Sequence, residues 1–171
     1  MIKVYSYEIV FREVPNEVTL ALNLSMCPHH CDGCHSPWLW SDDGTELTIE
    51  KISEYLLAQP KCRVTTCVAF MGGDNDIERL FELNREVKSR FPNIKTCWYS
   101  GFNYTDVSLN YYNELKEFDY LKFGPYMKDL GGLDSLSTNQ VFFKRLSSRV
   151  MENITKEFQK YGKSDMPQAG L

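Results

Sequence analysis

Residues 17–34 read EVTLALNLSMCPHHCDGC, and this stretch joins a strand pattern to three closely spaced cysteines. The segment Glu17–Leu24 alternates and is rich in aliphatic residues, which predicts a β-strand. Cys27, Cys31 and Cys34 follow at once in the spacing C-x3-C-x2-C. A [4Fe–4S] cluster normally takes four cysteine ligands, so three thiolates without a fourth nearby could hold three irons and leave one iron open. The stretch therefore predicts a strand that delivers a cluster-binding loop.

The rest of the chain alternates between predicted helices and predicted strands. Apolar residues at helical spacing predict three helices: Thr48–Gln59, Asn75–Phe91 and Thr105–Phe118. Thr48 is positioned to cap the first of them. Apolar, partly β-branched runs predict strands at Val64–Met71, Ile94–Tyr99 and Tyr120–Phe123, and Asn139–Leu146 is a candidate for another.

Strands that alternate with helices pair in parallel through right-handed crossovers. The predicted units are too few for a full (β/α)8 barrel, so we expect an α/β fold of mostly parallel strands, arranged as an open, partial (β/α) barrel. Ligands of such folds gather at the carboxyl ends of the strands. The cysteine loop, Gly72-Gly73-Asp74 and Ser100-Gly101 each follow a predicted strand there. We therefore expect these three segments to form one site.

The length of 171 residues favours a single domain, 1–171. In residues 147–171 we expect a C-terminal helix and tail, with the helix over Ser147–Gly162. Four apolar residues recur there on one helical face: Val150, Ile154, Phe158 and Tyr161. Such a face most often packs on its own domain.

Charge and hydropathy argue against several classes of function. The 19 basic and 23 acidic residues give a net charge of −4, whereas nucleic-acid binding needs a basic excess or stripe. No apolar run approaches the ~20 residues that span a bilayer. Residues 1–5 do not begin the long apolar region of an export signal. Six cysteines in such a chain indicate metal or redox chemistry rather than disulfides. We therefore expect a cytoplasmic enzyme that binds neither nucleic acid nor membrane.

The other three cysteines, Cys62, Cys67 and Cys97, lack the repeated C-x2-C spacing of additional clusters. Each lies in or beside a predicted strand, where a free cysteine is most often a small buried hydrophobic residue. The sequence therefore predicts a single cluster.

The cysteine spacing resembles that of the radical S-adenosylmethionine enzymes. Four later segments add to the resemblance: Met71-Gly72-Gly73-Asp74, Trp98–Phe102, Lys122–Tyr126 and Thr138-Asn139-Gln140. In this order and at this length, the chain from about Val18 to Arg145 resembles the activating proteins of the anaerobic (class III) ribonucleoside-triphosphate reductases.

The resemblance implies two cofactors and a set of residues that bind them. Cys27, Cys31 and Cys34 would hold a [4Fe–4S] cluster, and S-adenosyl-L-methionine would bind its open iron. The residues that would contact S-adenosylmethionine are Gly72, Gly73 and Asp74 at its methionine end, then Tyr99, Ser100 and Gly101. Many members of the superfamily carry an aromatic residue before the third cysteine, where this chain has Gly33. Contact with the adenine would then fall to backbone groups or to His35.

The resemblance also implies an activity, a glycyl radical enzyme activase. A one-electron donor such as flavodoxin or ferredoxin would reduce the cluster, and cleavage of S-adenosylmethionine would give a 5′-deoxyadenosyl radical. That radical would abstract a glycine Cα hydrogen in the anaerobic ribonucleoside-triphosphate reductase, the partner protein. No catalytic residue is needed beyond the cluster and cofactor, because the cofactor performs the chemistry.

Other interpretations of the same residues remain open at this point. His29, His30 or His35 could complete a Cys3His zinc set in a binding module without turnover. Asp74 or Asn75 could cap the following helix, Tyr99 could pack in the core, and Gly101 could make a turn. Within enzymes, the chain could activate a different glycyl radical enzyme or act on a small molecule.

Overall fold

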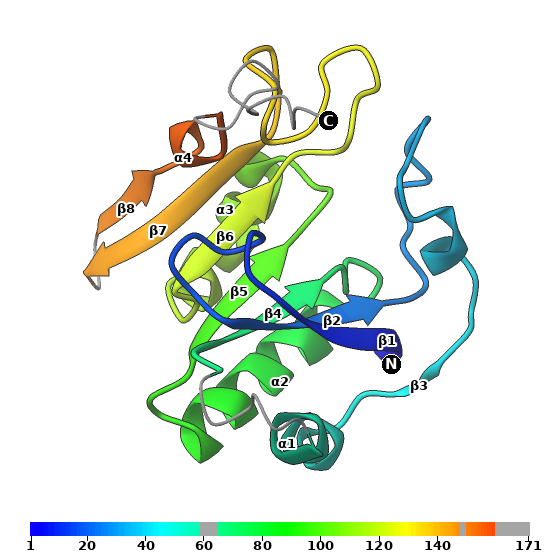
Figure 1. The fold of residues 1–171 in the computed structure, drawn as a ribbon, viewed down its shortest axis with the longest axis vertical. Helices are drawn as coiled ribbons and strands as arrows, with labels where there is room; N and C mark the ends of the chain where they lie inside the picture. The colour runs from blue at the N-terminus through cyan, green and yellow to red at the C-terminus, as the bar shows by residue number, and fades with distance from the viewer. Residues whose placement is uncertain (59–64, 148–149, 160–171) are drawn as a thin grey trace, which may run out of the picture.

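The computed structural model describes residues 1–58, 65–147 and 150–159 (Figure 1). Eight strands form one open sheet in the order β3-β1-β2-β4-β5-β6-β7-β8. Its centre is parallel and consists of four strands: β2 (Thr19–Leu24), β4 (Cys67–Met71), β5 (Lys95–Tyr99) and β6 (Tyr120–Phe123). The predicted α/β fold is thus confirmed, and the open sheet is consistent with a partial barrel.

Antiparallel strands extend the sheet at both sides. On one side β1 (Lys3–Val10) pairs with β2 and with the short β3 (Thr45–Glu46). On the other side β7 (Val141–Ser147) pairs with β6, and β8 (Val150–Asn153) pairs with β7. The sheet is therefore parallel at its centre and antiparallel toward its edges. Of these outer strands, the sequence had indicated only β7.

Three helices cover one face of the sheet: α1 (Ile49–Ala58), α2 (Ile77–Arg90) and α3 (Tyr104–Leu115) (Figure 1). The first two lie within their predicted ranges, and α3 begins one residue before its predicted start at Thr105. The Thr48 cap is confirmed, since the Lys51 amide donates to Thr48 Oγ1 at 3.4 Å. At α2 the capping residue is Asp76, whose Oδ1 accepts from the Arg79 amide at 3.2 Å. This cap leaves the side chain of Asp74 available for other contacts.

The helix predicted over Ser147–Gly162 is wrong for its first part. Residues 150–153 form β8, because their backbone groups pair with β7, and the only helix described there is α4 (Lys156–Gln159). Ile154 and Phe158 nevertheless pack against the sheet as apolar residues of the same stripe. A short strand followed by a short helix can therefore bury residues spaced four apart, as a helix does. Tyr161 lies outside the described residues.

The alternation of side chains along the central strands creates two cores. The larger one lies under the helices and includes Phe70, Trp98 and Phe123. The opposite, inner face carries Cys67, Ala69, Cys97, Tyr120 and Phe142, covered by Val14, Ile154 and Phe158. In Figure 1 the loop between β1 and β2, which contains Val14, crosses this inner face. The inner face is thus filled by packed side chains.

Cys67 and Cys97 belong to this inner core, as predicted. Both thiols are completely buried, and burial raises the pKa of each well above its ordinary value. They are therefore small apolar side chains with little thiolate character. Cys62 lies outside the described residues. Within the described ranges, no helix is long and apolar enough to cross a bilayer.

Candidate metal centre

The loop that follows β2 carries the three cysteines of the motif. It is fixed on both sides by backbone hydrogen bonds, since the Ser25 amide donates to the Lys3 carbonyl at 3.1 Å and the Cys27 amide to the Leu39 carbonyl at 3.0 Å. The Cys34 amide closes a turn on the Cys31 carbonyl at 3.1 Å. All three cysteines are free thiols, partly exposed. The loop thus presents them outside both cores.

The surroundings of Cys27 disfavour its thiolate form unless a cation is bound nearby. Burial raises the pKa of its thiol, and the negative charges of Asp74 and Cys31 raise it further, while the backbone N–H groups of His29 and His30 point to the sulfur and oppose this rise. A thiolate is the form that ligates metal. Positively charged iron would favour that form here.

Zinc and a [4Fe–4S] cluster make different demands on the donors of this loop. Among the described residues, which include the whole cysteine loop, no three His, Cys, Asp or Glu side chains converge on a point where they could share one metal ion. Structural zinc needs four donors around one ion. In a [4Fe–4S] cluster each cysteine ligates a different iron, so the thiols can stand further apart. Cys27, Cys31 and Cys34 are spaced in sequence like the ligands of such a cluster.

The loop after β4 places Asp74 beside the cysteine loop. Gly73 has φ +93°, and a Cβ there would lie 2.9 Å from Cδ1 of Leu80, so the turn requires glycine. Gly72 also has positive φ, and its carbonyl accepts from Trp98 Nε1 at 3.0 Å. The tight turn brings the carboxylate of Asp74 to the carboxyl edge of the parallel sheet.

Asp74 joins two of the predicted segments and does not cap the next helix. Its Oδ2 accepts from Nε2 of His29 at 2.6 Å and from the Gly101 amide at 2.7 Å. The side chain is only 2% exposed, and Oδ1 is buried without a partner among the described residues. Since buried polar atoms are normally paired, this oxygen indicates a place for a donor from a ligand.

The three predicted residues at the carboxyl end of β5, Tyr99, Ser100 and Gly101, have different surroundings. Gly101 lies at the site through its amide, whereas the Ser100 hydroxyl accepts from the Phe102 amide at 3.0 Å within its own turn. The Tyr99 hydroxyl donates to the Glu13 carbonyl, and its ring packs edge-on against Phe142. The structure therefore brings Gly101 to Asp74 but holds the Tyr99 hydroxyl at the inner core.

Lys122 is a buried cation near the site that the sequence analysis did not select. It is 8% exposed, and its Nζ donates to the Gly124 carbonyl at 2.6 Å. Burial lowers its pKa to about 8, against the opposing influence of the negative charges of Asp74, Cys31 and Cys27. A lysine inside the apolar run YLKF was the available signal, because a buried lysine needs partners. Lys122 thus supplies positive charge close enough to act on Asp74, Cys31 and Cys27.

The segment after β6 lies against the cysteine loop. The ring of Tyr126 lies 5.0 Å from that of His35. A Cβ at Gly33 would meet the Lys128 side chain at 3.4 Å. The Asn139 amide group donates to the Pro125 carbonyl at 2.9 Å and thereby fixes this segment. The later motifs and the cysteine loop are therefore neighbours, and His35 lies on the exposed rim of the site.

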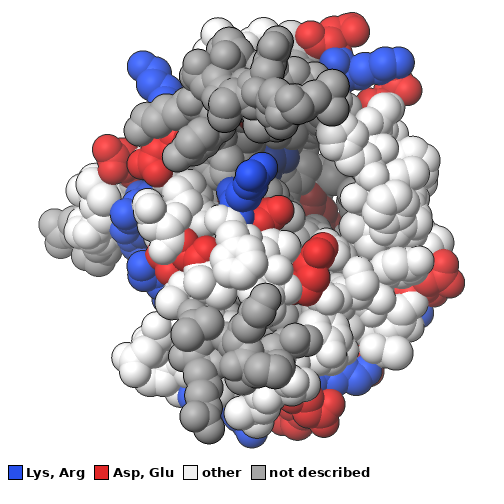
Figure 2. Space-filling model, viewed as in Figure 1, with Lys and Arg blue, Asp and Glu red and all other residues white. Residues whose placement is uncertain are grey.

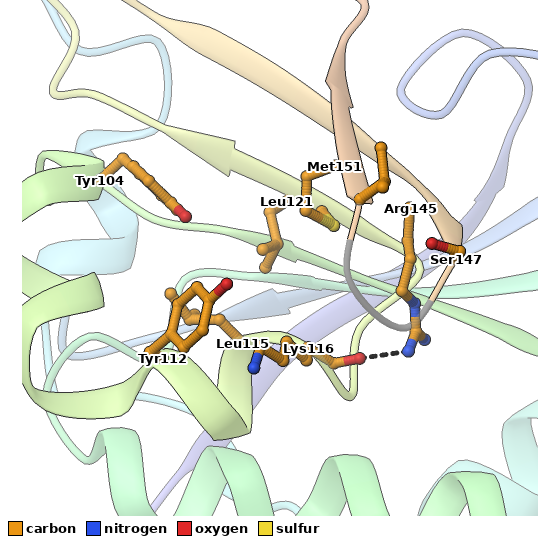
Figure 3. Close-up of a pocket in the computed structure, with 9 residues that line it drawn as sticks. Tyr104, Tyr112, Leu115, Lys116, Leu121, Arg145, Ser147 and Met151 are labelled. Carbon is orange, nitrogen blue, oxygen red and sulfur yellow. Dashed lines mark hydrogen bonds between the residues drawn. The ribbon is translucent and has the colours of Figure 1, made fainter.

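A cavity of about 220 Å³ lies elsewhere, between α3 and the strands β6 to β8 (Figure 3). The guanidinium of Arg145 at its wall is already held by the Lys116 and Glu117 carbonyls and by Asp119 Oδ1 at 3.0 Å. Figure 2 shows acidic and basic side chains interspersed over the face in view, without an extended basic patch among the residues drawn in colour. The cavity and the charged side chains on this face therefore offer no functional site comparable to the cysteine loop.

The fold and the site together define a class, an α/β domain that presents three cysteines in C-x3-C-x2-C spacing at the carboxyl ends of its parallel strands. The chain belongs to the family of 4Fe-4S single cluster domains, whose family model matches residues 17–157. It is a radical S-adenosylmethionine-type domain, as found in activating enzymes, and hence an enzyme. Comparison with curated proteins and with solved structures gave no match.

Proposed function

We propose that this protein is a glycyl radical enzyme activase and that its partner is an anaerobic ribonucleoside-triphosphate reductase. The observation that carries the proposal is the meeting of the C-x3-C-x2-C loop with the buried carboxylate of Asp74, which has one oxygen unpaired. A single-cluster domain of the radical S-adenosylmethionine type supports the chemistry. The partner follows from the resemblance of residues 122–126 and 138–140 to the activating proteins of these reductases.

The residues present fit both cofactors. Cys27, Cys31 and Cys34 would hold the cluster, and three ligands leave one iron for S-adenosylmethionine. The unpaired Oδ1 of Asp74 would accept from its ammonium group, directly after the Gly72-Gly73 turn. Gly101, Tyr126 and His35 would border the rest of the cofactor.

When bound, the reduced cluster and S-adenosylmethionine supply a 5′-deoxyadenosyl radical, which removes one hydrogen atom from a glycine Cα of the partner. The chain's own residues position the cofactor. Asp74 orients the cofactor by its ammonium group, and Lys122 balances the negative charge of Asp74, Cys27 and Cys31. The partly exposed loop remains open to a protein segment. A flavodoxin or ferredoxin would supply the electron.

The test is an anaerobic assay of the reconstituted, dithionite-reduced protein for 5′-deoxyadenosine. It is run with and without a class III reductase, and electron paramagnetic resonance detects a glycyl radical. We expect cleavage of S-adenosylmethionine and a radical on the reductase. Cleavage without the radical would direct the search to another glycyl radical enzyme or to a small substrate. A full cluster without any cleavage would contradict the proposed function.

A further inference from the structure

The side chain of His29 connects the cysteine loop to the loop after β4. Its Nε2 lies 2.6 Å from Oδ2 of Asp74, and its ring stands edge-on to Phe102 with 4.6 Å between ring centroids. An ionised carboxylate only accepts hydrogen bonds, so Nε2 is the donor. His29 lies between two predicted cluster ligands in sequence, Cys27 and Cys31. The contact therefore links the cluster loop to a residue 45 positions away.

The imidazole also fills the space above Gly101. A Cβ at Gly101 would lie 2.4 Å from Cδ2 of His29, which is closer than side chains approach one another. The Gly101 amide donates to the same Oδ2 of Asp74 at 2.7 Å. Glycine at this position thus lets the loop after β5, the cysteine loop and Asp74 meet.

The two donors on Oδ2 fix the orientation of the carboxylate. With Oδ2 occupied, Oδ1 is the oxygen left buried without a partner among the described residues. Carboxylate oxygens can rotate when nothing restrains them, and the strength of a charge-assisted hydrogen bond depends on geometry. A restrained Asp74 would meet a ligand's ammonium group without first losing that freedom.

We propose that His29 is a positioning residue that holds Asp74 so that Oδ1 receives the ammonium group of S-adenosylmethionine. This inference rests on the proposed function and extends it to a residue outside the cofactor's direct contacts. The cluster loop and the ammonium site are then coupled, because the residue that positions Asp74 lies between two cluster ligands.

The test compares His29→Asn with His30→Asn in the anaerobically reconstituted full chain. His30 is the matched control, because its ring stacks on Trp40 at 4.9 Å and its φ of +46° suits asparagine. Equilibrium binding of S-adenosylmethionine is measured beside iron and sulfide content. We expect His29→Asn to keep the cluster and to weaken binding roughly tenfold or more, as for partners that orient a ligand-binding group. His30→Asn should bind within about twofold of the unaltered protein.

Two further measurements separate positioning from a general effect on folding. His29→Gln retains a donor at similar reach and should restore most of the affinity. An analogue of S-adenosylmethionine without the α-amino group should bind the unaltered protein and His29→Asn equally. Gly101→Ala, which displaces the imidazole from another element, should weaken binding as well, and the double variant should lose little more than either single one.

Three results would each overturn the inference. His29→Asn could bind S-adenosylmethionine as tightly as the unaltered protein, it could lose no more affinity than His30→Asn, or it could lose the cluster. Failure of the unaltered, cluster-loaded protein to bind S-adenosylmethionine would instead overturn the proposed function, and the inference with it. The two failures are therefore distinguishable in one set of binding curves.

Discussion

At the scale of single residues, the described cysteines divide by their surroundings. Cys27, Cys31 and Cys34 are partly exposed on a loop, whereas Cys67 and Cys97 are buried in the inner core. The sequence predicted this division, because short spacing in a loop and isolated positions in strands are different patterns. It could not identify His29 as the partner of Asp74, because their contact depends on how two loops meet in the folded chain.

Replacement of Cys27 by alanine should abolish cluster binding and cleavage of S-adenosylmethionine together, because the loop then offers two thiols. Cys97→Ala is the matched control and should retain both, with a cost in stability of about 1–2 kcal/mol for a small cavity. Iron and sulfide content and 5′-deoxyadenosine formation measure these effects. Cleavage of S-adenosylmethionine by Cys27→Ala would refute the assignment of this ligand.

Lys122 should make stability depend on pH in the alkaline range. Its folded pKa is lowered to about 8 from an ordinary 10.5, so between these values the unfolded chain binds more protons. The free energy of unfolding of the apoprotein should then rise with pH from about 8, through this residue by at most about 1.4 kcal/mol per pH unit.

The measurement is urea denaturation of the apoprotein and of Lys122→Met between about pH 8 and pH 9.5. The difference between the two curves isolates Lys122 from other groups that titrate there. We expect the unaltered apoprotein to gain stability relative to Lys122→Met as the pH rises. Parallel curves would mean that the lysine is not perturbed in the folded protein.

At the scale of elements, a polar group on the inner face ties three central strands together. Glu17, just before β2, accepts hydrogen bonds from Lys95 at the start of β5 and from Tyr120 at the start of β6, the latter at 2.7 Å. Burial raises the pKa of Glu17, but hydrogen bonds from Lys95, Thr66 and Tyr120 outweigh burial and lower it below 4.5. These contacts gather at the amino ends of the strands, opposite the cysteine loop.

Glu17→Gln should destabilise the protein by about 1–3 kcal/mol at pH 7, because it weakens hydrogen bonds to a buried carboxylate. A carboxyl whose folded pKa is lowered adds stability above its unfolded pKa, near 4.5, and this stability is lost as the pH falls further. The melting temperature, measured between pH 3 and pH 7, should therefore fall more steeply with decreasing pH for the unaltered chain than for Glu17→Gln. The exposed Glu8→Gln on β1 is the control and should follow the unaltered chain.

The elements also show which parts of the fold the sequence could predict. The central strands and the three helices carry strong apolar patterns and were predicted to within a few residues. The outer strands were harder, because β1 and β8 expose residues such as Tyr5 and Val150 and resemble loops or helical stripes. At β8 the apolar spacing of 150, 154 and 158 matched a helix, whereas pairing with β7 decided the structure.

At the scale of the whole molecule, the site stands apart from what stabilises the fold. Neither apolar core contains a cysteine of the loop. Removal of the cluster with a chelator under reducing conditions should therefore leave the far-ultraviolet circular dichroism and the cooperative unfolding largely intact. This contrasts with zinc fingers, which unfold without metal.

The same experiment should change the loop itself. Limited proteolysis should cut residues 25–44 faster in the apoprotein than in the loaded protein, because a cluster held by Cys27, Cys31 and Cys34 would cross-link three positions of that segment. Cleavage fragments identified by mass spectrometry provide the measurement. Global loss of secondary structure on chelation would show that the cluster is part of the folding core.

The filled inner face also bears on the order of events during turnover. Val14, Ile154 and Phe158 cover this face, and the Glu17 group occupies the amino ends of the strands, so the cysteine loop is approached from the carboxyl side. A small cofactor seated there would lie beneath any protein that docks over it. Its exchange would then have to wait until that protein leaves. Turnover should accordingly follow a compulsory sequence, with the small molecule first to arrive and last to depart.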